Sequence, residues 1–152
     1  MFTGTTFYQM GFIATDLDRA TERLARDHGI HRFRRKQTSP AMQAAHAWVG
    51  DVMVELIQVT AEANAVFQSN APAAPEAIRL HHHGYRVADL DGWQALDRKI
   101  AEAGLSCPMM GSAMNDQLHF RYVDTRATLG IYSEYICLTG EALSMYDDVP
   151  RN

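Results

Sequence analysis

One pattern of apolar and polar positions runs through the first half of the chain. Residues 7–14 are rich in aromatic and apolar side chains, which predicts a strand, and Asp16 follows where a helix N-cap belongs. The helix is expected to end at Gly29, which can adopt the left-handed conformation of a C-terminal cap. Its apolar positions keep helical spacing and are Leu17, Ala20 and Leu24. Three more strands are predicted over residues 30–35, 42–49 and 52–60, with a tight turn at Gly50-Asp51.

The second half repeats this order. Residues 81–87 predict a strand, Asp89 an N-cap and Gly104 the end of a helix. The apolar positions of this helix are Leu90, Trp93, Leu96, Ile100 and Ala103. Further strands are predicted over residues 105–110, 117–123 and 130–138.

Matches at a slowly growing offset indicate that the two halves are copies. Asp16-Leu17-Asp18 matches Asp89-Leu90-Asp91 at an offset of 89 − 16 = 73, and Gln9 matches His82 at 82 − 9 = 73. Gly29 matches Gly104 at 104 − 29 = 75, and Glu55 matches Glu134 at 134 − 55 = 79. Loop insertions lengthen the offset of a duplicated unit in this way.

We therefore predict an α+β fold made of two tandem βαβββ units, with curved, cup-like mixed sheets and the helices outside. The units are expected over residues 7–60 and 80–138 of a single domain that spans residues 1–152. An alanine-rich linker over residues 61–79, with room for one helical turn, would join them.

Composition narrows the class of protein. The chain is 47% hydrophobic and 21% charged, as in ordinary globular proteins, and its net charge of −4 gives no bulk attraction to nucleic acid or to an anionic membrane. Two cysteines make no disulfide framework, and no apolar run approaches the ~18 residues of a membrane span. The first residues lack the features of a secretory signal. We expect a cytoplasmic protein with no nucleic-acid or membrane partner.

Two carboxylates interrupt otherwise apolar strands. Glu55 lies within residues 52–57 and Glu134 within residues 130–137, where an unpaired charge is costly. The repeat makes them equivalent, as it does Gln9 and His82, and a pseudo-twofold axis would bring the four together. Their donors suit a divalent ion such as Zn, Ni, Co, Mn or Fe(II). The alternatives are that the glutamates form buried ion pairs with arginines, that His82 is structural, and that Gln9 satisfies backbone groups.

These segments resemble a known superfamily. The resemblance covers about residues 7–138 and rests on four segments, Gln9-Met10-Gly11-Phe12, Val54-Glu55-Leu56-Ile57, His81-His82-His83-Gly84-Tyr85 and Tyr132-Ser133-Glu134-Tyr135. The pattern is similar to that of the vicinal oxygen chelate superfamily, which includes glyoxalase I, methylmalonyl-CoA epimerase, extradiol dioxygenases and bleomycin-resistance proteins. The resemblance implies the metal ligands Gln9, Glu55, His82 and Glu134, a set like that of glyoxalase I. Epimerases of this superfamily usually carry His and Gln at the first two places.

The same resemblance implies a metal-dependent lyase or isomerase of the glyoxalase or epimerase type, which stabilises an enolate of a small carbonyl substrate. Glu134 and Glu55 would be the catalytic acid and base. The substrate would be a thiol conjugate or an acyl-CoA, and the protein a homodimer. The alternative function is a metal-free protein that binds or sequesters a small molecule on the same scaffold.

Other polar residues are weaker candidates. His119 and Arg121 share one face of the strand predicted over residues 117–123, where they would either contact substrate or face solvent. Tyr132 is a further candidate for the wall of the substrate pocket. A basic cluster, formed by Arg32, Arg34, Arg35 and Lys36, would be either a solvated strand end or an anion site for the tail of the substrate.

Overall fold

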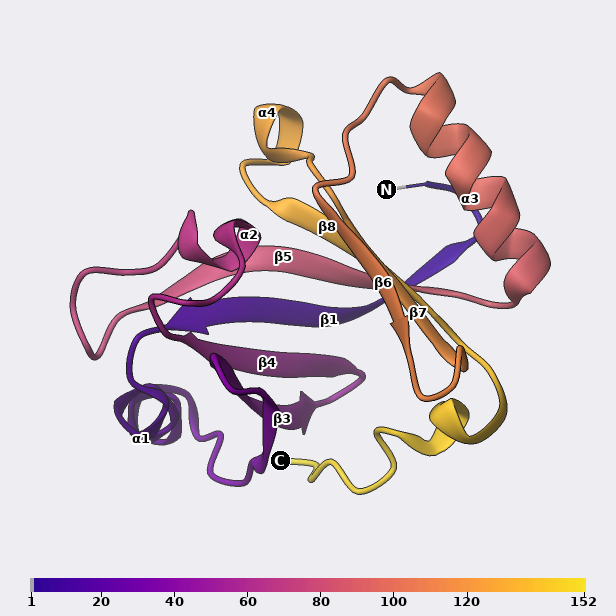
Figure 1. Cartoon of the computed structure of the whole chain (residues 1–152). Coiled ribbons are helices and arrows are strands. Elements are labelled where there is room, and N and C mark those ends of the chain that lie inside the picture. Colours follow the sequence, from indigo (N-terminus) through magenta and orange to yellow (C-terminus); the bar gives the residue numbers. More distant parts are fainter. Residues whose placement is uncertain (1) are drawn as a thin grey trace. The chain divides into compact units, whose positions relative to one another are not determined.

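The computed structural model describes residues 2–152 and confirms the α+β class (Figure 1). In this part of the chain the strands are β1 (Thr5–Ala14), β2 (Arg34–Ser39), β3 (Met42–Val49), β4 (Val52–Val59), β5 (Ile78–Val87), β6 (Met109–Ala113), β7 (Leu118–Val123) and β8 (Tyr132–Leu138). The α-helices are α1 (Leu17–His28), α2 (Ala65–Gln68), α3 (Leu90–Glu102) and α4 (Arg126–Leu129), and a 3-10 helix covers Gly140–Ser144. None of these helices is long and apolar enough to cross a membrane.

The chain divides into two compact units. The N-terminal unit comprises residues 9–81 and 148–152, and the C-terminal unit comprises residues 2–8 and 82–147. Strands follow the order β2-β3-β4-β1 in the first and β5-β8-β7-β6 in the second. In each, the outer strands pair antiparallel, while β1 pairs parallel with β4 and β5 pairs parallel with β8. Both units therefore have the predicted βαβββ order and the same pairing.

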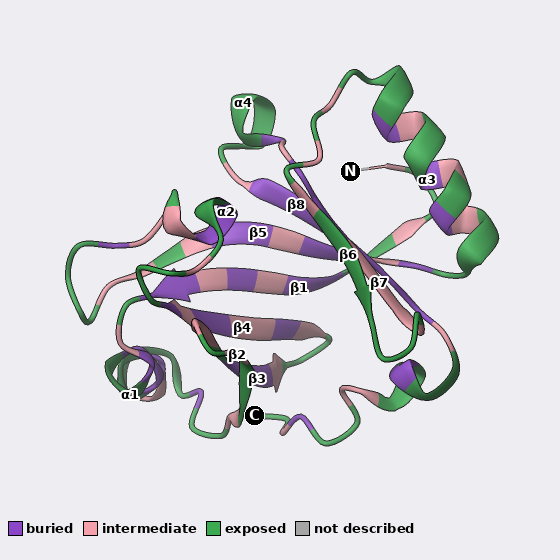
Figure 2. Ribbon diagram, in the orientation of Figure 1, coloured by how far each residue is buried: buried purple, intermediate pink, exposed green. Residues whose placement is uncertain are grey.

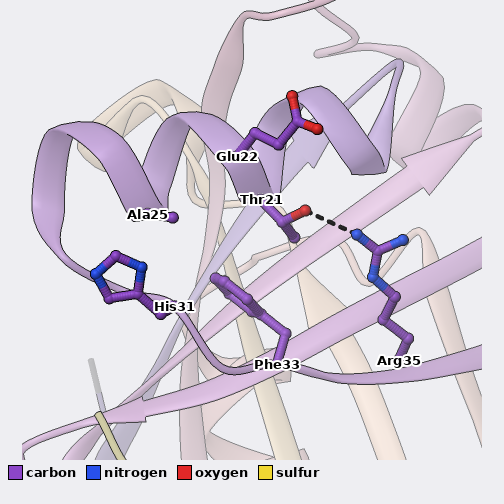
Figure 3. Close-up of a pocket in the computed structure, with 6 residues that line it drawn as sticks. All are labelled: Thr21, Glu22, Ala25, His31, Phe33 and Arg35. Atoms are coloured by element: carbon purple, nitrogen blue, oxygen red, sulfur yellow. Dashed lines mark hydrogen bonds between the residues drawn. The ribbon is translucent and has the colours of Figure 1, made fainter.

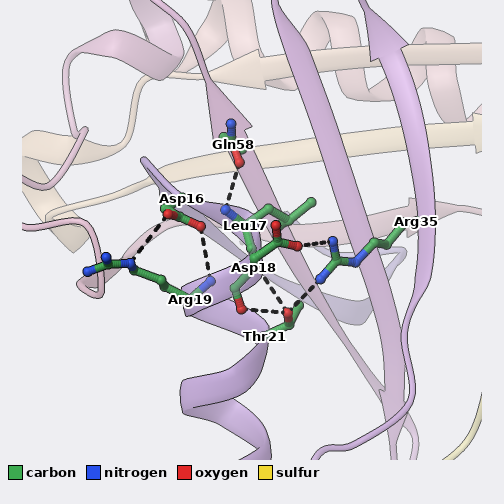
Figure 4. Close-up of polar contacts among 7 residues, drawn as sticks. All are labelled: Asp16, Leu17, Asp18, Arg19, Thr21, Arg35 and Gln58. Atoms are coloured by element: carbon green, nitrogen blue, oxygen red, sulfur yellow. Dashed lines mark hydrogen bonds and ion pairs between the residues drawn. The ribbon is translucent and has the colours of Figure 1, made fainter.

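Helix α1 is fixed at its start by a network of polar contacts (Figure 4). The side chain of Asp16 accepts a hydrogen bond of 3.0 Å from the backbone N–H of Arg19, and Gln58 on β4 accepts one from the N–H of Leu17. Gly29 ends the helix with φ of 71°, as expected. The buried face of α1 packs on the sheet of the N-terminal unit in a core of Ala14, Leu17, Ala20, Leu24, Ile30, Ala45, Ala47 and Leu56.

Helix α3 repeats this arrangement in the C-terminal unit. Asp89 accepts a hydrogen bond of 2.8 Å from the N–H of Gly92. The core beneath the helix contains Tyr85, Val87, Trp93, Leu96, Ile100, Val123, Tyr135 and Cys137. The buried face of α3 is shorter than the predicted apolar face, because Leu90 and Ala103 at its two ends are exposed. Figure 2 shows the buried positions of α3 on the side that packs against its own sheet.

Two strand predictions were displaced along the chain. Strand β2 begins at Arg34 rather than at residue 30, and β6 begins at Met109 rather than at residue 105. Each is the edge strand of its unit, and its extent is set by pairing with the neighbouring strand and not by an apolar pattern of its own. The linker contains the one expected helical turn, α2, whereas α4 and the 3-10 helix were not predicted.

The segment 148–152 closes the edge of the N-terminal unit. The N–H of Trp48 donates to the carbonyl of Pro150 over 2.9 Å, and the N–H of Asn152 donates to the carbonyl of Trp48 over 2.9 Å. The side chain of Asn152 accepts hydrogen bonds from the N–H groups of His31 and Arg32. Residues 31–32 therefore bond to this segment instead of starting β2.

Candidate active site

The two repeats present their polar residues at the same sheet register. Glu55 on β4 is the register partner of Gly11 on β1, and Glu134 on β8 is the partner of Gly84 on β5. Gln9 and His82 each lie two residues before these glycines. Because alternate residues of a strand face the same way, each unit carries its donor pair on one face of adjacent strands. This register confirms that Gln9 is equivalent to His82, and Glu55 to Glu134.

In the N-terminal unit, the amide of Gln9 is buried at 1% exposure, and its Oε1 has no hydrogen-bond partner among residues 2–152. Glu55 is held by His46, whose Nε2 lies 2.9 Å from Oε1 of the carboxylate. His46 was not among the residues predicted for the site. The signal was available, because a two-residue turn at Gly50-Asp51 pairs Val49 with Val52 and so sets His46 opposite Glu55.

In the C-terminal unit, His82 is fully buried, and its Nε2 lies 3.4 Å from Oε2 of Glu134. Glu134 is itself 9% exposed. Tyr122 is the register partner of Glu134, as His46 is of Glu55, and its ring meets His82 edge-on at 5.1 Å. Tyr132, the register partner of His82, lies on the same face and is buried. The C-terminal donor pair is thus enclosed by aromatic side chains.

His119 and Arg121 lie on the opposite face of their sheet from Glu134. The guanidinium of Arg121 stacks over the ring of Trp93 on α3 at 4.1 Å and forms an ion pair with Asp97, while the His119 ring lies 5.9 Å from that of Trp93. Burial lowers the pKa of Arg121 from its ordinary value. Odd-numbered positions of β7 face the helix, because they share the face of buried Val123. This placement does not support the expected contact with a substrate beside Glu134.

The basic cluster is largely engaged within the N-terminal unit. Arg34 pairs with Asp148, Arg35 with Asp18, and Arg32 donates to the carbonyl of Arg151. Arg35 also donates to Thr21 over 2.8 Å, at the rim of a cavity of about 260 Å³ between α1 and the strand that follows it (Figure 3). The cavity is lined by Thr21, Glu22, Ala25, His31, Phe33 and Arg35. These arginines already have partners within the unit, so they give little support to an anion site for the tail of a substrate.

The donor chemistry fits a divalent cation. The amide oxygen of Gln9 is buried without a partner, and the two carboxylates and the imidazole of His82 supply oxygen and nitrogen donors with a total charge of −2 when His82 is neutral. Among residues 2–152, no three His, Cys, Asp or Glu side chains form a ready-made metal cluster. The structure therefore provides two donor pairs, one in each unit. The ionic contact of Glu134 is with His82 and not with an arginine.

Comparisons with known proteins support the fold. No family model matches the chain, and no curated protein matches it. Among solved structures, methylmalonyl-CoA epimerase from Mycobacterium tuberculosis has a TM-score of 0.65 at 15% identity, with 91% of each chain covered. A variant of methylmalonyl-CoA epimerase from Streptomyces coelicolor, in complex with 2-nitronate-propionyl-CoA, has a TM-score of 0.64 at 17% identity and covers 88% of this chain and 97% of its own. A hypothetical protein from Bacillus halodurans C-125 has a TM-score of 0.62 at 13% identity, covering 92% and 99%. The likeness does not single out glyoxalase I; it shows that this chain shares the fold of these epimerase structures, which agrees with the predicted fold class.

Proposed function

We propose that the protein is a metal-dependent isomerase of the epimerase type, which moves a proton on the carbon next to a carbonyl group. The observation that carries the proposal is the repeated register of Gly11 with Glu55 and of Gly84 with Glu134, which places a carboxylate beside a second donor in each unit. The likeness to epimerase structures supports the choice of reaction class, and an acyl-CoA is the favoured substrate.

We assign Gln9, Glu55, His82 and Glu134 as the ligands of one divalent ion, within a chain or across a homodimer. When bound, the ion would supply Lewis-acid stabilisation of the negative charge that develops on the carbonyl oxygen. The buried, unpartnered oxygen of Gln9 supports this assignment, since leaving such a group unsatisfied costs free energy.

Glu134 is the better candidate for proton transfer. Oε1 of Glu55 lies 2.9 Å from Nε2 of His46, within hydrogen-bonding distance. The contact of Glu134 with Nε2 of His82 is longer, at 3.4 Å, and restrains the carboxylate less firmly. Glu134 would therefore remove the proton as a base, and Glu55, in its protonated form beside His46, would return a proton from the opposite side. Tyr132, the register partner of His82, would contact the substrate.

The test combines metal analysis with isotope exchange. Purified protein is examined for bound metal, and metal-loaded protein is then incubated with methylmalonyl-CoA in D₂O while loss of the α-proton signal is followed by NMR. Glu134→Gln keeps an oxygen for the metal but cannot act as a base, so exchange is expected to fall by about 10²–10⁴-fold with metal partly retained. Exposed Glu141, changed to Gln, is the matched control and should leave the rate unchanged.

Each other outcome has a distinct meaning. Full exchange in metal-loaded Glu134→Gln would refute the proton-transfer role. The glyoxalase-type lyase predicts instead that the protein converts the hemithioacetal of glutathione and methylglyoxal. A protein without metal that binds an acyl-CoA and exchanges no proton would be the sequestering protein named as the alternative.

A further inference from the structure

A cationic side chain lies on the same face as His82 and Glu134. Arg86 follows His82 by four residues on β5, and its register partner is Ile136, two residues after Glu134. Even-numbered positions of β5 face away from α3, because Tyr85 and Val87 contribute to the core beneath that helix. At about 3.3 Å per residue, Arg86 lies about 7 Å along the strand from Gly84, the partner of Glu134.

Arg86 is flanked by aromatic rings. Its guanidinium carbon lies 4.8 Å from the ring centre of Tyr8 and 5.6 Å from that of Tyr146, and the two ring centres are 6.1 Å apart. Within residues 2–152 no carboxylate forms an ion pair with Arg86, and its Nε is buried without a hydrogen-bond acceptor. By contrast, several arginines of the chain have acidic partners, namely Arg34, Arg35, Arg121 and Arg126.

A half-buried guanidinium held in this way is prepared for an anion. Its planar fork of N–H donors matches the two oxygens of a carboxylate, and the flanking rings restrict its orientation before any ligand arrives. Since Nε lacks an acceptor in the chain, a bound carboxylate would satisfy a donor that is otherwise left unpaired.

We propose that Arg86, with Tyr8 and Tyr146, forms a subsite for a free carboxylate on the acyl group of the substrate, separate from the thioester. The inference rests on the proposed function and deepens it, because it selects acyl groups that carry a carboxylate at the end remote from the reacting carbon. Arg86 lies two residues beyond the register partner of Glu134 on the same face, which favours a carboxylate a few bonds from the reacting carbon. The phosphates of coenzyme A lie much farther away, beyond the pantetheine arm.

Binding of glutarate, a five-carbon dicarboxylate, tests the subsite without metal or turnover. Isothermal titration calorimetry at low ionic strength with EDTA compares the wild type with Arg86→Met, Arg86→Lys and Arg126→Met. Arg126 is the matched control, because it also stacks over a tyrosine ring, that of Tyr132, but is already paired with Asp124. We expect Arg126→Met to bind like the wild type and Arg86→Met to bind about 10- to 100-fold more weakly, as loss of a charge-assisted hydrogen bond implies.

Three results would overturn the subsite: no glutarate binding by the wild type, equal affinity in Arg86→Met, or tighter binding of inorganic phosphate than of glutarate. If Arg86→Met fails to fold, the glutarate affinity of Arg86→Lys provides the test, since lysine keeps the positive charge but lacks the planar pair of guanidinium N–H donors. Wild-type affinity in Arg86→Lys would also overturn the proposal. Because none of these measurements depends on turnover, a failed subsite remains distinguishable from a failed epimerase.

Discussion

The contact between His46 and Glu55 gives a quantitative test of the site. The His46 side chain is buried at 6% exposure, the Glu55 side chain is partly buried at 13%, and Nε2 and Oε1 are 2.9 Å apart. A hydrogen bond to a charged group contributes about 1.5–3 kcal/mol, and removing one partner leaves the other buried and unsatisfied. We therefore expect His46→Phe and Glu55→Leu each to destabilise the metal-free protein. The double variant should recover part of the loss, because it leaves neither partner behind.

The assay is a double-mutant cycle measured by urea and thermal unfolding in EDTA, so that bound metal does not contribute. For a chain of 152 residues, each kcal/mol shifts the melting temperature by about 2–4 °C, so a coupling of about 1.5–3 kcal/mol corresponds to about 3–12 °C. The cycle of His82→Phe with Glu134→Leu is the internal comparison. Its coupling should be smaller, because the corresponding contact is 3.4 Å long.

Additive effects would refute this reasoning. If the double variant loses as much stability as the two single variants together, with a coupling below about 0.5 kcal/mol, then His46 does not hold Glu55 in solution. The choice of Glu134 rather than Glu55 as the base would lose its support with it.

The remaining predictions concern the core, the thiols, acid stability and assembly. Leu96→Ala should cost about 2–5 kcal/mol in urea unfolding, because Leu96 is 2% exposed in the core beneath α3. Burial raises the pKa values of Cys107 and Cys137, so both should react slowly with iodoacetamide near neutral pH, and buried Cys137 should react only as the protein unfolds. The hydrogen bond from Arg126 lowers the pKa of Asp124. The stabilisation of the folded state by this pair, about 0.2–1 kcal/mol, is present above the unfolded pKa of Asp124 near 4 and is lost as pH falls through its folded pKa. Comparing the melting temperatures of Asp124→Asn and the wild type at pH 7 and pH 3 checks this. Light scattering should show a dimer, and a mass near 17.0 kDa would contradict it.

The repeat made most of the fold predictable. Offsets between matching residues located both helices, their caps at Asp16 and Asp89, and the register that makes Glu55 equivalent to Glu134. Edge strands were harder, since β2 is polar and depends on pairing for its limits. The side of β7 on which Arg121 lies could not be read from alternation alone, because alternation separates two faces without saying which one a helix covers. The ring pair around Arg86 joins residues 8, 86 and 146, which no local pattern connects.

The parallel pairing of β1 with β4 and of β5 with β8 has a consequence for how the protein folds. Gln9 pairs with Met53, 53 − 9 = 44 residues away, and His82 with Tyr132, 132 − 82 = 50 residues away, whereas the hairpins of β3 with β4 and of β7 with β8 close over short loops. Contacts between distant segments form slowly, because a long loop must be closed before they stabilise anything. In each unit the hairpin that carries the glutamate can therefore form early, while the strand that carries Gln9 or His82 docks beside it late. A nascent or partly unfolded chain presents isolated carboxylates, and the paired donors exist only once a unit has finished folding.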